Sequence, residues 1–495
     1  MMIYLRIKSK KLLLPWLVII RMRSFIFNEV MKLRRQTLIK MAEMYENNQL
    51  EDEIDKLPKI MLPGPEGKYR GSVYHEREVL KNRIKNYLGL DYDKTKDKEL
   101  YELTPFLDEI LSGKSDLKSE KFVQVIKEAC DSCPSGRYYV TDLCRNCVAH
   151  SCMNACPKNA ISFENGRAVI DTEKCIGCGL CSKSCSYFAI VKLERPCERA
   201  CSVNAVIKDE DNSAKINEEK CVNCGNCYIS CPFGAVETPS YLMNVLYSLK
   251  NFKNNIAIFA PAIVSQFGPK VSIGQIKDAL KKAGFDNAYE VAIGADIVAQ
   301  EEAELLDNTE ELVTTSCCPA FVEYIKKHQH KYIKNISPAP SPMIALAKKV
   351  KEENKDSNII FIGPCIAKKS EAYNSNYIDY VITFEELGAL LIAKNIEPTD
   401  FENEDIEGSY DAWNFAASGG VTKAVENRMK KENITTLKMN GLEEGKQIFK
   451  DLEKENINLL EGMACFGGCI SGPGVLINPR VANNGLKKIK TLDKI

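Results

Sequence analysis

The sequence lacks a charge bias and lacks a hydrophobic run long enough to cross a membrane. Its 495 residues carry 67 Lys and Arg against 67 Asp and Glu, so the formal net charge is zero. Nucleic-acid-binding domains usually carry a basic excess, and we therefore predict no nucleic-acid partner. The apolar run at 12–20 has nine residues and contains Pro15, whereas a membrane span needs about 20. We expect no membrane span.

The start of the chain also lacks a complete export signal. Basic residues precede the apolar run, but Arg21, Met22 and Arg23 follow it where a small-residue cleavage site would stand. We interpret residues 1–22 as a non-structural extension, with translation starting at Met22 or Met31, and expect a cytoplasmic protein. No GxGxxG or GxxxxGKS/T segment is present, so direct use of a nicotinamide or nucleotide is not expected.

Cysteine, in contrast, is abundant and clustered. Of 21 cysteines, 16 lie between Cys130 and Cys231 and five lie between Cys317 and Cys469. Disulfide frameworks are typical of small secreted domains, but these cysteines occur in CxxCxxCxxxC runs within a long chain. We therefore predict a reduced metal protein, with two to four domains at this length.

Three runs have the spacing of bacterial ferredoxins. Residues 175–185 and 221–231 read CxxCxxCxxxC, and residues 144–156 read CxxCxxxxCxxxC. In such motifs three thiolates hold one 4Fe–4S cluster and the fourth ligates the neighbouring cluster. This rule divides the 16 cysteines into four groups: Cys144, Cys147, Cys152 and Cys185; Cys175, Cys178, Cys181 and Cys156; Cys221, Cys224, Cys227 and Cys201; and Cys130, Cys133, Cys197 and Cys231.

The fourth group leaves an alternative open. Cys130, Cys133 and Cys197 also suit a zinc site, or no metal at all, whereas CxxCxxCxxxC runs do not match the paired CxxC of zinc ribbons. We predict two to four 4Fe–4S clusters in residues 119–240, which form a ferredoxin-like α+β domain.

The flanking regions differ in their hydrophobic pattern. Residues 23–118 are charged, with apolar residues at helical spacing, and predict a helical N-terminal segment. Residues 245–495 contain short apolar runs at 256–259, 312–315, 359–362 and 380–383, which are typical of buried strands in a mainly parallel α/β domain. Ligands bind at the carboxyl ends of such strands, where Cys317, Cys318 and Cys365 stand.

Three cysteine segments in this last region resemble the signature segments of the FeFe-hydrogenase catalytic domain. They are Thr315-Ser-Cys-Cys-Pro319, Gly363-Pro-Cys-Ile-Ala-Lys368 and Met463-Ala-Cys-Phe-Gly-Gly-Cys-Ile-Ser-Gly-Pro-Gly474. Thiolates suit iron, and glycine lets the backbone approach a bulky inorganic group. The resemblance implies a two-lobed α/β domain with an H-cluster, which is a 4Fe–4S cubane joined to a two-iron unit with CO, CN and azadithiolate ligands.

The resemblance also implies residue roles. Cys318, Cys365, Cys465 and Cys469 would ligate the cubane, and Cys469 would bridge to the two-iron unit. Cys317 would exchange a proton with the bridging amine, and the Lys368 ammonium would donate to a cyanide. The remaining implied roles are a proton relay at Glu302, packing by Met463 near the bridging carbonyl, and contact with the two-iron pocket by Ala260, Pro261, Ser418, Gly419 and Gly420.

The sequence departs from the family pattern around the outer proton route. Leu305 stands where the second relay glutamate is usual, with Glu304 one residue early, and Pro338 replaces a relay serine, with Ser337 adjacent. Gly363 replaces the usual methionine of the lysine-bearing segment. These departures resemble a less-studied branch, group B.

The implied activity is H2 ⇌ 2H+ + 2e−, with ferredoxin or flavodoxin as electron partner and maturation proteins that install the two-iron unit. One alternative is a hydrogenase-like iron–sulfur protein without that unit, acting in electron transfer or cluster assembly; Cys317 and Lys368 argue against it, since a cubane alone needs neither. A hydrogen sensor is a second alternative, although no signalling domain is visible in the sequence.

Overall fold

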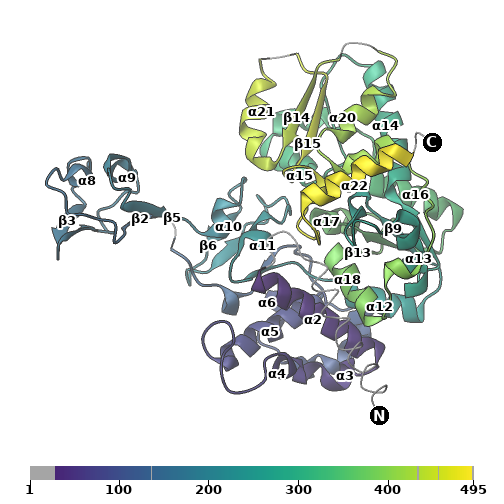
Figure 1. The fold of residues 1–495 in the computed structure, drawn as a ribbon, viewed down its shortest axis with the longest axis horizontal. Helices are drawn as coiled ribbons and strands as arrows, with labels where there is room; N and C mark the ends of the chain where they lie inside the picture. Colours follow the sequence, from purple (N-terminus) through teal and green to yellow (C-terminus); the bar gives the residue numbers. More distant parts are fainter. Residues whose placement is uncertain (1–27, 135, 432–433, 455, 493–495) are drawn as a thin grey trace.

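The computed structural model describes residues 28–134, 136–431, 434–454 and 456–492. The predicted extension at 1–22 lies outside these residues. Figure 1 shows a helical N-terminal part, a small lobe that projects to one side, and a larger α/β body. No helix in the described ranges has both the length and the apolar character needed to cross a bilayer.

The N-terminal part is helical, as its apolar spacing predicts. The Asn28 side chain accepts from Met31 N at 2.9 Å and caps the first helix, and Ser72 caps the longest one that follows. Side-chain oxygens at these positions satisfy N–H groups that have no partner inside the helix. The helices are α2 (Glu29–Glu46), α3 (Leu50–Glu53), α4 (Leu57–Met61), α5 (Val73–Tyr87), α6 (Tyr92–Thr95) and α7 (Leu107–Leu111).

Buried ion pairs attach these helices to the rest of the molecule. Arg34 Nε and Arg83 Nε each donate to Glu237 Oε1 at 2.9 Å, and all three side chains are almost completely buried. Arg35 Nε donates to Glu385 Oε1 at 2.7 Å. The N-terminal helices therefore contact both the ferredoxin-like region and the α/β body.

The cysteine-rich region contains two similar units of short antiparallel strand pairs and short helices. One unit adjoins the body and has β1 (Gln124–Val125) with β8 (Val236–Glu237), β6 (Val206–Lys208) with β7 (Ala214–Ile216), α10 (Pro196–Arg199) and α11 (Asn226–Ser230). The other is the projecting lobe (residues 136–194), with β2 (Arg137–Val140) and β5 (Ile190–Leu193), β3 (Ile161–Glu164) and β4 (Arg167–Ile170), α8 (Ser151–Asn154) and α9 (Leu180–Ser184) (Figure 1).

The projecting lobe is inserted into the first cysteine run of the other unit. The chain leaves after Cys133 and returns at Arg195, whose Nε donates to Cys133 O at 2.6 Å. Arg195 also donates to Asn212 O and Ser213 O and is buried. The point where the chain enters the lobe and the point where it leaves therefore lie side by side.

The body contains two parallel sheets. One has the order β10 (Asn287–Glu290), β9 (Asn255–Phe259), β12 (Asn358–Ile362), β13 (Tyr380–Ile382), and the other has β11 (Val313–Thr314), β15 (Leu459–Met463), β14 (Thr436–Asn440). All five residues of β9 are buried, as helices cover the sheets. The helices are α12 (Leu242–Asn251), α13 (Ile273–Ala283), α14 (Val291–Asp307), α15 (Pro319–His328), α16 (Pro342–Glu353), α17 (Ala367–Tyr373), α18 (Phe384–Ala393), α19 (Tyr410–Trp413), α20 (Gly420–Glu426), α21 (Gly445–Asp451) and α22 (Pro479–Leu492).

The four predicted apolar runs are the strands β9, β11, β12 and β13. The predicted class, a mainly parallel α/β domain with an α+β iron–sulfur region and a helical N-terminal segment, is confirmed.

Candidate active site and metal centres

The cysteines of the body follow three strands at their carboxyl ends. Cys317 and Cys318 follow β11 and precede α15, Cys365 lies between β12 and α17, and Cys465 and Cys469 follow β15. Because the strands of each sheet are parallel, the segments that leave their carboxyl ends share one edge of that sheet. Segments that are far apart in the sequence meet in this way.

Four of these thiols lie within electrostatic range of one another. Each of Cys318, Cys365 and Cys469 raises the pKa of Cys465, and Cys318 and Cys365 raise that of Cys469. Burial raises the pKa of Cys365 and of Cys469 to about 12, and mutual repulsion adds to the shift. Thiols in such a place become thiolates only with a cationic partner. Four neighbouring thiols are a donor set that iron–sulfur clusters use.

Glycine lets the loop between Cys465 and Cys469 lie against a second segment. Gly468 has φ 93°, and a Cβ on it would lie 2.6 Å from Ala416 O and 2.7 Å from Ser418 N. Any larger residue would force the two backbones apart. Ser418 N also donates to Gly467 O at 3.2 Å, so the predicted segment Ser418–Gly420 contacts this loop.

A buried carboxylate that the sequence reasoning missed holds the same segment. Glu461, on β15, accepts from Gly419 N at 2.5 Å and from Thr422 N and Oγ1 at 2.8 and 2.7 Å. Its side chain is completely buried. The residue is an acid within an otherwise apolar strand, and this is the only signal for it in the sequence.

Lys368 is buried and ionised beside the cysteines. Its Nζ donates to Ser341 Oγ at 2.9 Å and to Glu371 Oε2 at 2.6 Å. Burial alone would lower the pKa of Lys368, but Glu371 raises it above the ordinary value, and Cys365 and Cys317 are also within electrostatic range. An ammonium has three donors, so two protein contacts leave one for another acceptor. Ser341, which caps α16, was not predicted from the sequence.

The partly buried Cys317 and the buried Glu302 are neighbouring groups that can each carry a proton. Burial raises the pKa of Cys317 well above its usual value, and Glu302 adds to the rise. Glu302 lies on α14 and accepts from Ser316 N at 3.3 Å. Burial raises its pKa to about 7, while Ser316 N and the Ser337 side chain lower it. A carboxyl with this pKa can take and release protons near neutral pH.

The remaining predicted residues lie at the same strand ends. Ala260 follows β9 and donates from its N to Ile362 O at 2.8 Å, Pro261 is buried beside it, and Met463 ends β15 in a buried position. The glycine at position 363, where methionine is usual, has a steric explanation, because a Cβ there would lie 2.6 Å from the Phe361 ring.

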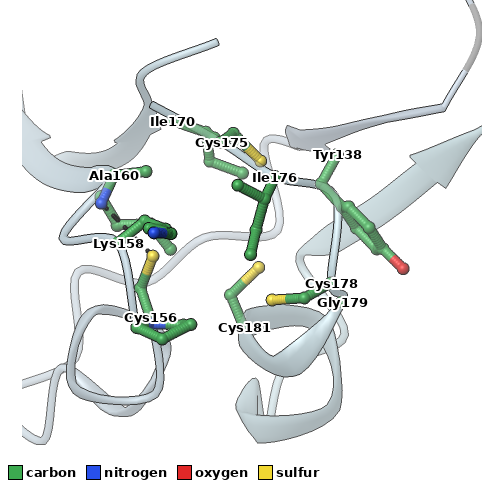
Figure 2. A pocket seen from close by; sticks show the side chains of 12 residues that line it. Tyr138, Cys156, Lys158, Ala160, Ile170, Cys175, Ile176, Cys178, Gly179 and Cys181 are labelled. Atoms are coloured by element: carbon green, nitrogen blue, oxygen red, sulfur yellow. Dashed lines mark hydrogen bonds between the residues drawn. The ribbon is translucent and has the colours of Figure 1, made fainter. Parts of the chain in front are cut away.

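Three of the four predicted cysteine groups of the ferredoxin-like region each line a pocket. Figure 2 shows Cys156, Cys175, Cys178 and Cys181 around the pocket in the projecting lobe. The other two pockets are lined by Cys201, Cys221, Cys224 and Cys227, and by Cys130, Cys133, Cys197 and Cys231.

The last group lies in the small core of the projecting lobe. Cys152 is coupled to Cys185 and Cys147, and burial raises the pKa of Cys152. Cys144 packs in the same core. Among the described residues, no three His, Cys, Asp or Glu side chains are arranged to hold a single metal ion.

A backbone motif recurs at the last cysteine of each run. The alanine four residues later donates its N–H to the cysteine Sγ at 3.1–3.4 Å, and the residue between them, three after the cysteine, has a left-handed backbone. Donors of this kind stabilise sulfur that carries negative charge. The motif was not predicted, although the spacing is visible in the sequence; the pairs are Cys156 and Ala160, Cys185 and Ala189, Cys201 and Ala205, and Cys231 and Ala235.

The cysteine groups of the unit that adjoins the body approach the cysteines of the body. Cys227 lies within electrostatic range of Cys197, and Cys224 within range of Cys365. These two groups therefore form a series that reaches the body.

Comparison with known proteins finds matches for two of these regions. Residues 253–473 match the family described as "Iron only hydrogenase large subunit, C-terminal domain", and residues 168–191 and 214–237 match "4Fe-4S binding domain". Iron hydrogenase 1 of Clostridium pasteurianum is 27% identical over 405 residues, which cover 67% of this chain and 69% of that protein. The periplasmic Fe hydrogenase large subunit of Nitratidesulfovibrio vulgaris is 28% identical over 63% of this chain and 87% of its own length.

Two further similarities cover less of the chain. The NADP-reducing hydrogenase subunit HndD of Solidesulfovibrio fructosivorans is 26% identical, and the chain spans 53% of its length. A solved structure of the FeFe-hydrogenase HydA1 from Chlamydomonas reinhardtii aligns with 50% of this chain and 88% of its own, at 18% identity and a TM-score of 0.42.

Proposed function

We propose that this chain, which carries 4Fe–4S binding domains and the catalytic-type domain of the iron-only hydrogenases, catalyses the reversible reaction H2 ⇌ 2H+ + 2e−. The main support is that Cys318, Cys365, Cys465 and Cys469 lie within electrostatic range of one another, with Cys317 and Lys368 also in range. We propose the domain bounds 23–118, 119–240 and 245–495.

The four cysteines would hold the cubane of an H-cluster, with Cys469 as the bridge to the two-iron unit. When bound, the H-cluster supplies the iron chemistry that forms or splits H2. Cys318 is buried and the other three are partly buried, and burial raises the pKa of each thiol, so the protein would limit the access of water to the cluster. Lys368 Nζ would donate to an anionic ligand, and Glu461 would keep the segment Ser418–Gly420 against the pocket, where Ala260, Pro261 and Met463 pack.

Protons would pass between Cys317 Sγ and the Glu302 carboxyl. Glu302 raises the pKa of Cys317, so the two groups are electrostatically coupled. The pKa of about 7 for Glu302 suits a group that accepts a proton in one direction of the reaction and returns it in the other.

Electrons would pass through four 4Fe–4S clusters, held by the cysteine groups of residues 119–240. The order runs from the projecting lobe, through Cys130, Cys133, Cys197 and Cys231, to the group of Cys224, which is coupled to Cys465. A ferredoxin or flavodoxin is the proposed partner, maturation proteins would install the two-iron unit, and the reduced thiols fit a cytoplasmic location.

Infrared spectroscopy tests the proposal. Protein produced anaerobically with hydrogenase maturation enzymes should show carbonyl and cyanide bands that shift when H2 is added and removed. The Cys469→Ala variant, matched in preparation, should lose these bands while the ferredoxin-like clusters remain. If protein with loaded cubanes shows no such bands, the hydrogenase proposal is wrong and a role in electron transfer or cluster assembly replaces it. Bands without H2 turnover would favour a sensor.

A further inference from the structure

A cavity of about 160 Å³ adjoins the part of α14 that carries Glu302. It is lined by Glu301, Leu305, Ser337, Pro338 and Ala339. Glu301 and Leu305 are one turn apart on α14, and the other three residues belong to the loop before α16. The volume is sufficient for several water molecules, which a polar cavity holds when hydrogen-bonding groups face it.

The buried wall of this cavity adjoins Glu302. Ser337 is 4% exposed, and its side chain approaches Glu302 closely enough to lower the pKa of that carboxyl. Among the described residues, Glu302 Oε2 has no direct hydrogen-bond partner. Ser337 Oγ accepts from Ala339 N at 3.3 Å, and a hydroxyl that accepts one hydrogen bond can still donate its own proton. Ser337 lines the cavity and donates from its N to Thr314 O at 2.8 Å, two residues from the Ser316 N that donates to Glu302, so it lies close to the buried carboxyl.

The outer wall carries an exposed carboxylate. Glu301 is exposed and lines the cavity, whereas Glu302, the next residue on α14, is completely buried. Leu305 and Pro338, the other outer residues, carry no side-chain group that can exchange a proton. Glu301 is thus the titratable group of the lining that connects the cavity to solvent.

We infer that Ser337, water in this cavity and Glu301 form the outer part of the proton path in this chain. A proton leaving Glu302 passes through the Ser337 hydroxyl to cavity water and then to the Glu301 carboxylate, which exchanges it with solvent. Each step moves one proton and no electrons. The inference rests on the proposed role of Glu302 as the buried proton carrier.

Hydrogen–deuterium exchange at Glu302 tests the path without requiring turnover of H2. Holoprotein at about pH 6, where a carboxyl with a pKa of about 7 is mostly protonated, is mixed rapidly with D2O buffer. The carbonyl stretch of the protonated carboxyl, assigned by its loss in Glu302→Gln, reports the exchange rate. Glu301→Gln should slow this exchange by about 10-fold or more.

Glu304→Gln is the matched control. Glu304 is exposed on the same helix and accepts from Gln300 Nε2 at 2.8 Å, but it does not line the cavity. The control removes the same charge and should leave the exchange rate unchanged. Placing a carboxylate one turn along the same helix, as Leu305→Glu in the Glu301→Gln background, should restore fast exchange.

A double-mutant comparison shows whether Ser337 and Glu301 belong to one path. Ser337→Ala should slow the exchange, and the double variant with Glu301→Gln should be no slower than the slower single variant, because both interrupt the same series. Unchanged exchange in Glu301→Gln, or equal slowing by Glu304→Gln, would overturn the inference. A parent protein without H2 turnover but with this exchange pattern would refute only the proposed hydrogenase activity.

Discussion

Glu302 combines complete burial with a pKa near neutrality, and both properties can be measured. Its pKa rises from about 4.5 to about 7, chiefly because burial disfavours the charged form. A carboxyl with a raised folded-state pKa contributes stability below its unfolded pKa and loses it as the pH rises through the folded pKa. The raised pKa therefore lowers the free energy of unfolding by about 3 kcal/mol at about pH 7, compared with acid pH.

Replacement of Glu302 by Gln therefore has two expected results. Thermal unfolding at a fixed scan rate should show the variant gaining stability relative to the parent between about pH 5 and about pH 8, because Gln does not ionise. H2 turnover should fall about 100-fold or more, since the buried proton carrier is lost. A stability difference that does not vary with pH would contradict the assigned pKa.

Glu461 holds the backbone of Gly419 and Thr422 in place, and this role can be tested apart from the effect of its charge on the nearby thiols. A carboxylate accepts from all three donors on Gly419 and Thr422. The amide of Gln keeps one oxygen as an acceptor but points its two hydrogens at the donors of the other residue. We expect Glu461→Gln to lower the free energy of unfolding by about 2–3 kcal/mol. Thermal unfolding measures this loss, and Glu443→Gln at a surface position is the control. Equal stability of the two variants would exclude the role.

Individual residues differ in how far the sequence reveals them. The cysteine groups were proposed from local ligand spacing. Three of the groups each line a pocket, and Cys144, Cys152 and Cys185 of the fourth share one small core. Glu461 was not predictable, because its partners precede it by about 40 residues and meet it only after the sheet forms. Ser341 was not predictable for the same reason, since its contact with Lys368 joins two helices.

At the scale of elements, the attachment of α2 and α5 to β8 depends on Glu237. This carboxylate accepts from two buried guanidinium groups, Arg34 and Arg83. Removal of one partner from a buried ionic group leaves uncompensated charge, which costs about 3–5 kcal/mol. We expect Glu237→Gln to expose residues 28–118 to limited proteolysis. Glu43→Gln breaks the partly exposed Lys40–Glu43 pair and should not. Equal protease resistance would refute this view of the interface.

Strands differed in their predictability for a physical reason. Runs such as β9 and β12 are almost wholly buried, and buried parallel strands are nearly continuous in apolar residues. The strand β10 alternates partly buried with buried residues, β14 is mostly half-exposed at the edge of its sheet, and β15 contains Glu461. These three interrupt the apolar pattern, and they were not predicted.

At the scale of the molecule, removal of the projecting lobe should leave a complete ferredoxin-like unit. Deletion of 134–194 joins Cys133 to Arg195 and gives Cys130-Asp-Ser-Cys133-Arg195-Pro-Cys197-Glu-Arg-Ala-Cys201, which is a CxxCxxCxxxC run. The junction residues already touch, because Arg195 Nε donates to Cys133 O. The shortened protein should therefore fold and lose roughly eight iron atoms, which corresponds to two 4Fe–4S clusters.

Iron analysis and dye-linked H2 assays measure this outcome against the full-length chain. Activity with a small viologen dye should persist, because the proposed inner clusters would still adjoin the cysteines of the body, while reduction by a protein donor should slow. Loss of nearly all iron from the shortened chain would show that the lobe is needed for the fold of the inner unit.

The position of the lobe, which projects from two neighbouring points of the chain, also bears on which cysteine groups oxygen or a chelator attacks first. The lobe has its own small core, and its Cys178 is exposed, whereas the inner groups are largely enclosed. Oxygen or a chelator should therefore reach the lobe first. Loss of the clusters proposed there would interrupt the proposed electron route and leave the inner cysteine groups intact, so the projecting lobe would take oxidative damage before the body does.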